Sequence, residues 1–245
     1  MRIAVQRARR VIAVSESTRL DILRFLRADP AKVSVVYEGV GEQFFQPVSP
    51  APRRAILDYY GLTDPFLLFV GERRPHKNLV GLVRAFEIFS RSVPTSYRLV
   101  VAGKRYADYQ VPEQIVQESG LSECVLFIDD LPDAHLPALY QAADGFVLLS
   151  HYEGFGLPVL EAMASGAPVV ASNRTALPEV VGEAGILVDP DRPEEVAAAL
   201  NRLVSDEALR EEKITAGRER ARQFSWRKAA VKTIQVYEDA VDGLN

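Results

Sequence analysis

Two glutamates with seven residues between them stand in the stretch HYEGFGLPVLEA, at positions 151–162. Glu153 precedes a Gly-Phe-Gly turn, and Glu161 lies in the apolar segment that follows. Gly154 and Gly156 let the backbone approach a ligand closely, and the N–H groups of a helix that starts after them favour a phosphate. Carboxylates repel a phosphate unless they accept hydrogen bonds from hydroxyl groups. The pattern therefore predicts a diphosphate held between two sugars, as in a nucleotide sugar.

A purely structural explanation of the two glutamates is the alternative. Glu153 could cap a turn, and Glu161 could be a solvated residue of a surface helix. However, Glu161 stands among the apolar residues Val159, Leu160 and Met163. A carboxylate is seldom placed among apolar residues unless it has a binding partner. The ligand-binding interpretation is therefore favoured.

A second polar loop, VGERRPHKNL at 70–79, follows an apolar run. Gly71 allows a tight turn, and Arg73, Arg74 and Lys77 bring positive charge just before an expected helix start. A guanidinium fork and a flexible ammonium suit a diphosphate leaving group, on which negative charge builds as a glycosidic bond breaks. Such a loop is often solvated surface, but its expected place at the same sheet edge as the two glutamates favours a functional role.

Several other patterns point away from other chemistries. The aspartates in DD at 129–130 and DPD at 189–191 are explained by turns. The three histidines, His76, His135 and His151, lack ligand spacing with a cysteine or an acidic partner, so no metal site is expected. The sequence has no P-loop, no dinucleotide-binding glycine motif and no GxSxG nucleophile elbow.

The elements that must position these residues alternate along the chain. Short apolar runs separated by amphipathic segments predict an α/β fold, a Rossmann-like parallel sheet with helices on both faces. In such a sheet the loops after the carboxyl ends of the strands form the ligand crevice. The strands are expected at 66–70, 97–102, 125–128, 146–149, 168–171 and 186–188.

The helices are read from apolar spacing and end signals. Leu79, Leu82, Val83 and Phe86 recur at one helical face, and Asn78 is the expected N-cap. Further helices are expected at 136–143 and 157–165, and from Glu194 to Val241 with a break near Ser225. Before residue 53 the sequence predicts only two strands, at 11–14 and 33–36, around a helix at 17–27. Two strands are too small a sheet to hold a core alone.

Composition narrows the class of protein. With 245 residues, 48% of them hydrophobic, one large domain or one domain plus part of a second is expected. The net charge of −4 gives no reason to expect a nucleic-acid partner. Cys124 is the only cysteine, which favours a reducing compartment, and the cytoplasm is the expected location.

No segment is expected to span a membrane, because the longest apolar runs are strand-sized. The stretch MRIAVQRARRVIAVS contains four arginines, and a basic helix there could contact the inner membrane face peripherally. A solvated helix end is the favoured interpretation.

The ordered motifs resemble a family 4 retaining glycosyltransferase, mostly its C-terminal nucleotide-sugar-binding domain. The central motif is E-GFGLPVL-E at 153–161, and VIAVSESTRLDI, LLFVGERRPHKNLVGLVRAF and ALPEVVGEAGILVDP stand in the same order around it. The resemblance implies the GT-B architecture, with two Rossmann-like domains facing a cleft. The implied domains are the tail of an N-terminal acceptor domain and a linker at 1–52, with Pro47–Pro52 as the linker proper, a donor-binding domain at 53–223 and a C-terminal helix at 224–245.

The resemblance also assigns roles. Glu153 would contact the transferred hexose, and Lys77 and Arg73 would serve the diphosphate as it leaves; these three are the implied catalytic residues. Glu161 would bind the ribose, and 127–131 would edge the base. The implied donor-binding residues are Gly71, Arg74, Leu131, Gly154, Phe155, Gly156, Leu157, Pro158 and Glu161. No cofactor or metal is needed, transfer would proceed with retention, and the acceptor would be a glycan or a lipid-linked sugar.

Two departures from the family pattern stand out. Glu72 occupies the place of the usual arginine, so the guanidinium role passes to Arg73 or Arg74. Glu38 replaces an asparagine in the interdomain turn. The acceptor half expected of the family is absent from these residues, so this chain alone is expected to be inactive. The alternatives are a non-catalytic nucleotide-sugar-binding module or subunit completed by a separate acceptor domain, and a GT-B phosphorylase or epimerase.

Overall fold

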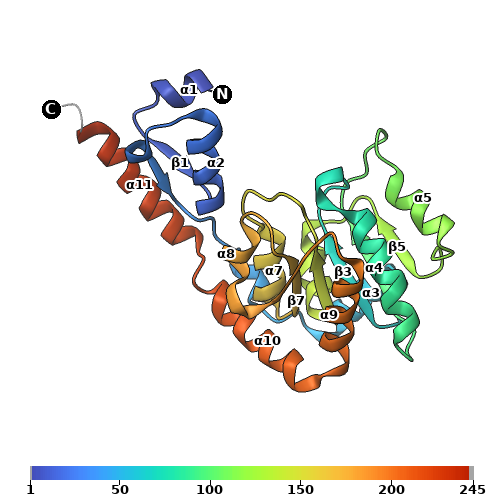
Figure 1. The fold of residues 1–245 in the computed structure, drawn as a ribbon. Helices are drawn as coiled ribbons and strands as arrows, with labels where there is room; N and C mark the ends of the chain where they lie inside the picture. Colours follow the sequence, from blue (N-terminus) through green and yellow to red (C-terminus); the bar gives the residue numbers. More distant parts are fainter. Residues whose placement is uncertain (1, 243–245) are drawn as a thin grey trace.

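The computed structural model describes residues 2–242, which form two separate parallel sheets (Figure 1). The larger has six strands in the order β5-β4-β3-β6-β7-β8. Its strands are β3 (Phe66–Val70), β4 (Arg98–Ala102), β5 (Val125–Ile128), β6 (Gly145–Leu148), β7 (Val169–Ser172) and β8 (Ile186–Val188). All six lie within about one residue of the expected positions, and all neighbouring pairs are parallel.

The strand order reverses between β3 and β6. From β3 the chain adds β4 and β5 on one side, then returns to add β6, β7 and β8 on the other. The loops after β3 and β6 therefore diverge and leave a crevice at the carboxyl edge, the usual ligand position in such sheets. The loop that contains Lys77 follows β3 and the loop that contains Glu153 follows β6, so both open onto this crevice.

Helices cover both faces of the sheet. α4 (Leu79–Ser92) packs against α5 (Val111–Glu118) and α9 (Pro193–Ser205), whereas α6 (Leu136–Ala142) packs against α7 (Leu157–Ser165) and α3 (Pro50–Tyr59). The apolar face expected of α4 is fully buried, and Asn78 accepts a hydrogen bond from the Gly81 N–H as its N-cap. Helix α8 (Leu177–Val181) follows β7, and α10 (Glu207–Ala221) packs on α7 and α9.

The first residues form a small unit beside this body. β1 (Val11–Ala13) and β2 (Val33–Val35) make a two-stranded parallel sheet, α2 (Glu16–Leu26) packs on it, and α1 (Arg2–Arg7) packs on α2. The last helix, α11 (Trp226–Asp242), leaves the body and runs alongside this N-terminal unit (Figure 1), where Arg9 donates to the carbonyl of Ala240.

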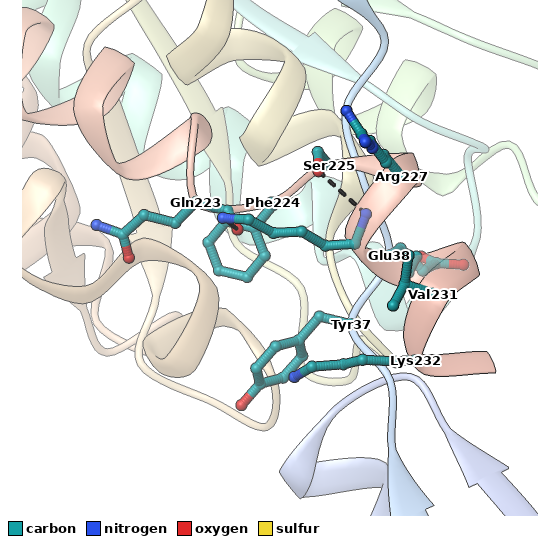
Figure 2. Close-up of a pocket in the computed structure, with 10 residues that line it drawn as sticks. Tyr37, Glu38, Gln223, Phe224, Ser225, Arg227, Val231 and Lys232 are labelled. Carbon is teal, nitrogen blue, oxygen red and sulfur yellow. Dashed lines mark hydrogen bonds between the residues drawn. The ribbon is translucent and has the colours of Figure 1, made fainter. Parts of the chain in front are cut away.

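The chain passes between the N-terminal unit and the body twice, and the two connecting segments pair at a bridge between Val40 and Ser225. A Cβ at Gly39 would lie 2.1 Å from the backbone nitrogen of Trp226, so only glycine fits this crossing. A hollow of about 480 Å³ lies beside it, lined by Tyr37, Phe224 and cationic side chains of early α11 (Figure 2).

Two expectations need correction. Pro50–Pro52, expected as linker, form the first turn of α3, because proline is well tolerated there. The C-terminal helical stretch breaks at Asp206 as well as near Ser225, since Asp206 accepts a hydrogen bond from the Leu209 N–H and starts a new helix. The structure also contains short turns of 3-10 helix at 30–32, 42–44, 75–77, 133–135 and 182–184, which are too short to show in apolar periodicity.

Within residues 2–242, none of the helices is both long and apolar enough to cross a bilayer. The same residues bring together no group of three or more histidine, cysteine or acidic side chains of the kind that holds a metal ion.

Candidate functional site

Lys77 and Glu153 meet across the crevice. The Lys77 Nζ lies 2.6 Å from Glu153 Oε1, and the Ser150 hydroxyl donates to the same oxygen at 2.6 Å. Both side chains of the ion pair are largely buried, 13% and 11% exposed, so solvent screens their attraction only weakly. The Glu153 N–H is held in turn by the Thr175 hydroxyl at 3.0 Å. The sequence prediction that the two loops meet at one edge is therefore correct in its geometry.

The amino end of α7 opens onto the same loop. Gly156 occupies the N-cap position with φ 119°, and no side chain caps the helix there. A Cβ at this glycine would lie 2.8 Å from Leu177 Cδ2, so both the backbone conformation and the space require glycine. Pro158 lies in the first turn and has no N–H to satisfy. An uncapped helix start with a positive dipole end is suited to an anion.

Glu161 lies one turn into α7 and faces α6. The buried Tyr140 hydroxyl donates to Glu161 Oε2 at 2.9 Å. Burial raises the pKa of Glu161 to about 7, with a further contribution from Asp133, while the tyrosine hydrogen bond lowers it. Unlike Glu153, this carboxyl group has no cation within salt-bridge distance among residues 2–242. It is therefore a group that is half ionised near neutral pH.

A hollow of about 360 Å³ lies at the carboxyl ends of β3, β4 and β5. Gly71 and Gly103 form its floor, where a Cβ at Gly103 would lie 2.1 Å from the carbonyl oxygen of Gly71. Leu131 and Leu136 give it an apolar wall, and the rim carries acidic side chains and Lys104. The hollow thus combines exposed glycine backbone, apolar side chains and charged side chains at one sheet edge.

The two arginines of the loop at 70–79 have different surroundings. Arg73 is 1% exposed: it pairs with Glu113 at 2.7 Å and with Asp129, and its guanidinium lies over the ring of Phe127 at 4.8 Å. Arg73 thus braces the loop from beneath, and the structure does not bring it to the Lys77–Glu153 pair. The catalytic role expected for Arg73 finds no support in this burial.

Arg74 lies at the surface of the same loop. Its guanidinium stacks on Tyr106 at 3.3 Å from the ring centroid, and it reaches Asp108 at 3.5 Å. Tyr106 also donates to Glu72, the residue at the place of the family's arginine. Unlike Arg73, this guanidinium is partly exposed to solvent, with 34% of its side chain accessible.

Some partners were not predicted from the sequence. Ser150, Tyr140 and Thr175 hold the two glutamates, and none of the three was predicted as their partner. A buried tyrosine needs a hydrogen-bond partner, and this requirement is the signal that could have found Tyr140. At the rim, His151 pairs with Asp191, and Arg174 reaches both Asp189 and Asp191, which agrees with a turn.

A six-stranded parallel sheet with a switch-point crevice and helices on both faces is a Rossmann-like fold, and its similarity to solved glycosyltransferases identifies the class of fold as GT-B. HepE from Anabaena, solved with UDP and glucose, superposes with a TM-score of 0.86 at 21% identity, over 96% of this chain and 64% of that one. The C-terminal domain of a group 1 glycosyl transferase from Francisella tularensis has a TM-score of 0.65 at 30% identity, over 76% of this chain and 97% of that one.

The sequence then gives the family. Residues 60–220 match the glycosyl transferases group 1, and the chain belongs to this family. The O-antigen chain mannosyltransferase B of Escherichia coli is 36% identical over 232 residues, which cover 94% of this chain. The chain spans 61% of the length of that relative. The resemblance stated from the motifs is confirmed at the level of this family.

Proposed function

We propose that this chain is the donor-binding part of a retaining glycosyltransferase, which transfers a hexose from a nucleoside diphosphate sugar to an acceptor hydroxyl. The observation that supports it best is the Lys77–Glu153 pair, 2.6 Å apart, beside the uncapped amino end of α7. An ammonium has three N–H donors, so Lys77 can keep Glu153 and still bind a phosphate oxygen.

Each part of the donor has a suitable neighbour. The diphosphate lies on the amino end of α7, with N–H groups from Phe155, Gly156 and Leu157, and Lys77 beside it. Glu153 accepts hydrogen bonds from hydroxyls of the transferred hexose, and Glu161 accepts from the ribose. The base occupies the hollow of about 360 Å³ at Gly71 and Leu131. Arg74 is the arginine proposed for the diphosphate, because Arg73 is buried beneath the loop.

The chemical step follows from these positions. As the bond between the anomeric carbon and the diphosphate oxygen breaks, the electron pair stays on the diphosphate, where the helix end and Lys77 stabilise it. The acceptor oxygen bonds to the carbon on the same face, and its proton passes to the departing phosphate. Configuration is retained, and fixed positive groups take the place of a metal ion.

The acceptor requires more than this chain. Because the chain covers 61% of its E. coli relative, we propose that a further N-terminal domain binds a glycan or lipid-linked acceptor. The exposed Ile3, Leu20 and Phe25 of the N-terminal unit lie where such a domain can pack. The protein is proposed to act in the cytoplasm, and a peripheral contact of its basic first residues with the inner membrane face is the less favoured alternative. The same incompleteness favours one alternative, a nucleotide-sugar-binding module that is not catalytic by itself.

Thermal unfolding of the chain with a panel of UDP, GDP and ADP sugars tests the proposal. A ligand that binds the folded state raises the unfolding midpoint by mass action. One member of the panel should raise it in the wild type, and by much less in a Lys77→Met variant. A panel without effect at millimolar concentration would contradict the proposal.

A further inference from the structure

Helix α2 of the N-terminal unit is capped by a carboxylate from the main body. Glu179 of α8 accepts the Glu16 N–H on Oε2 at 2.9 Å and the Ser17 N–H on Oε1 at 3.0 Å. The Tyr37 hydroxyl donates to Oε2 at 3.3 Å. The first N–H groups of a helix have no partner within it, and they carry the positive end of its dipole. Glu179 therefore provides the acceptors for the first N–H groups of α2, although it lies more than 160 residues away in the sequence.

The same helix contacts the Gly-Phe-Gly loop. The Thr18 hydroxyl donates to the carbonyl of Gly154 at 3.0 Å. Ser15, which is fully buried, donates to Thr18 Oγ1 at 2.9 Å and thereby orients that hydroxyl. One residue before Glu153, the Tyr152 hydroxyl donates to Asp21 at 2.8 Å. Helix α2 is thus one wall of the loop that holds Glu153.

The other wall is the segment that carries Glu179. Thr175, four residues earlier, accepts the Glu153 N–H and holds a left-handed backbone with φ 51°. Arg220 fixes this segment to α10, donating to the carbonyls of Glu179 and Val180 at 2.6 and 3.0 Å. The loop at 152–154 is therefore held between α2 and a segment that is itself anchored to the body.

We propose that Glu179 is a positioning residue: by tying α2 to the segment at 173–181, it holds the loop at 152–154 so that Glu153 and the amino end of α7 face the diphosphate. The part concerning the diphosphate rests on the proposed function, whereas the tie itself does not. A carboxylate suits the task because its two oxygens accept the two N–H groups together, and an amide offers only one acceptor oxygen.

Amide hydrogen exchange of the 245-residue chain, followed by NMR, tests the tie without any ligand. Glu179→Ala should speed exchange at the Glu16, Ser17 and Glu153 amides by about tenfold, because the first two N–H groups lose their acceptor and the loop that carries the third loses a wall. Glu179→Gln should give an intermediate rate. Glu183→Ala removes an exposed carboxylate on the next turn and should leave these rates unchanged. Wild-type rates in Glu179→Ala would overturn the proposal.

Calorimetric titration with UDP and with GDP then tests the effect on the site. Glu179→Ala and Thr18→Val should each weaken nucleotide binding by about five- to tenfold, and the double variant should be little worse than either alone, since both release the same helix. If the two losses of nucleotide affinity multiply fully in the double variant, the two residues act independently, and the proposal that α2 positions the loop is wrong. Absence of nucleotide binding in the wild type would instead contradict the proposed function, and the exchange rates would still decide the tie.

Discussion

Glu153 and Glu161 belong to one motif but lie in opposite electrostatic surroundings. Glu153 is paired with Lys77 and accepts from Ser150, so its charge is balanced before any ligand arrives. Glu161 has only the Tyr140 hydroxyl, and burial raises its pKa to about 7. The first carboxylate is suited, under the proposed function, to stay charged beside the transferred sugar. The second is held at an energetic cost, which hydroxyl donors of a ligand can offset.

Replacing Glu161 by glutamine should stabilise the free chain at pH 8 and have little effect at pH 5. In the folded chain the pKa of Glu161 lies above its ordinary value of 4.5, so the stability that Glu161 contributes is present below that value and lost as the pH rises through about 7. A shift of this size corresponds to a gain on the order of 3 kcal/mol at pH 8. Urea unfolding of both proteins at the two pH values measures it. An equal effect at both pH values would mean that ionisation of Glu161 is not the cause.

Replacing Lys77 by methionine should destabilise the chain by about 1–3 kcal/mol, because Glu153 is left largely buried with only a hydroxyl partner. The double variant Lys77→Met, Glu153→Gln should regain most of this loss, since no uncompensated charge remains. Chemical unfolding of the wild type, Lys77→Met, Glu153→Gln and the double variant tests the pair as a double-mutant cycle. If the second substitution adds a further loss, the pair does not act as a unit.

Elements differ in how completely their sequences predict them. The six strands are buried on both faces, so each appears as an apolar run between turn signals. The start of α7 at Gly156 was equally predictable, because a glycine followed by a proline is a typical signal of a helix start. In contrast, Arg73 was placed at the ligand because the sequence shows charge but not depth: Glu113 and Asp129, which bury it, stand 40 and 56 positions away. The tie from Glu179 to α2 was unpredictable for the same reason.

Gly156→Ala should cost more than the same change at Gly120, although both glycines have positive φ, 119° and 69°. A methyl group at Gly156 meets Leu177, whereas the space around Gly120 is empty to 4 Å. We expect a loss of about 1 kcal/mol at Gly120 and about 2–3 kcal/mol at Gly156. Nucleotide binding should suffer only at Gly156. Thermal unfolding and titration with UDP and GDP measure both effects, and equal losses would show that the helix start does not require glycine.

The whole molecule consists of one well-formed core and a dependent unit. The continuous hydrophobic core runs from Val40 to Phe224, whereas β1 and β2 form a sheet of only two strands. Leu20 and Phe25 of α2 and Ile234 and Tyr237 of α11 are 55–63% exposed. Apolar side chains left exposed on these two helices are suited to packing against further structure. The N-terminal unit thus depends on contacts beyond its own sheet, while the body does not.

A fragment of residues 36–225 should therefore fold cooperatively without the N-terminal unit and α11. It keeps the six-stranded sheet, and it retains Tyr37 and Phe224, whose rings flank Phe155 at 6.0 and 5.9 Å. The solved C-terminal domain from Francisella tularensis, which covers 76% of this chain, supports such a division. Calorimetry should show one transition within a few degrees of the main transition of the whole chain, since the core is unchanged. The fragment lacks α2, so its loop at 152–154 should exchange amides faster, as in Glu179→Ala. A fragment that melts without cooperativity would show that the N-terminal unit is part of the core after all.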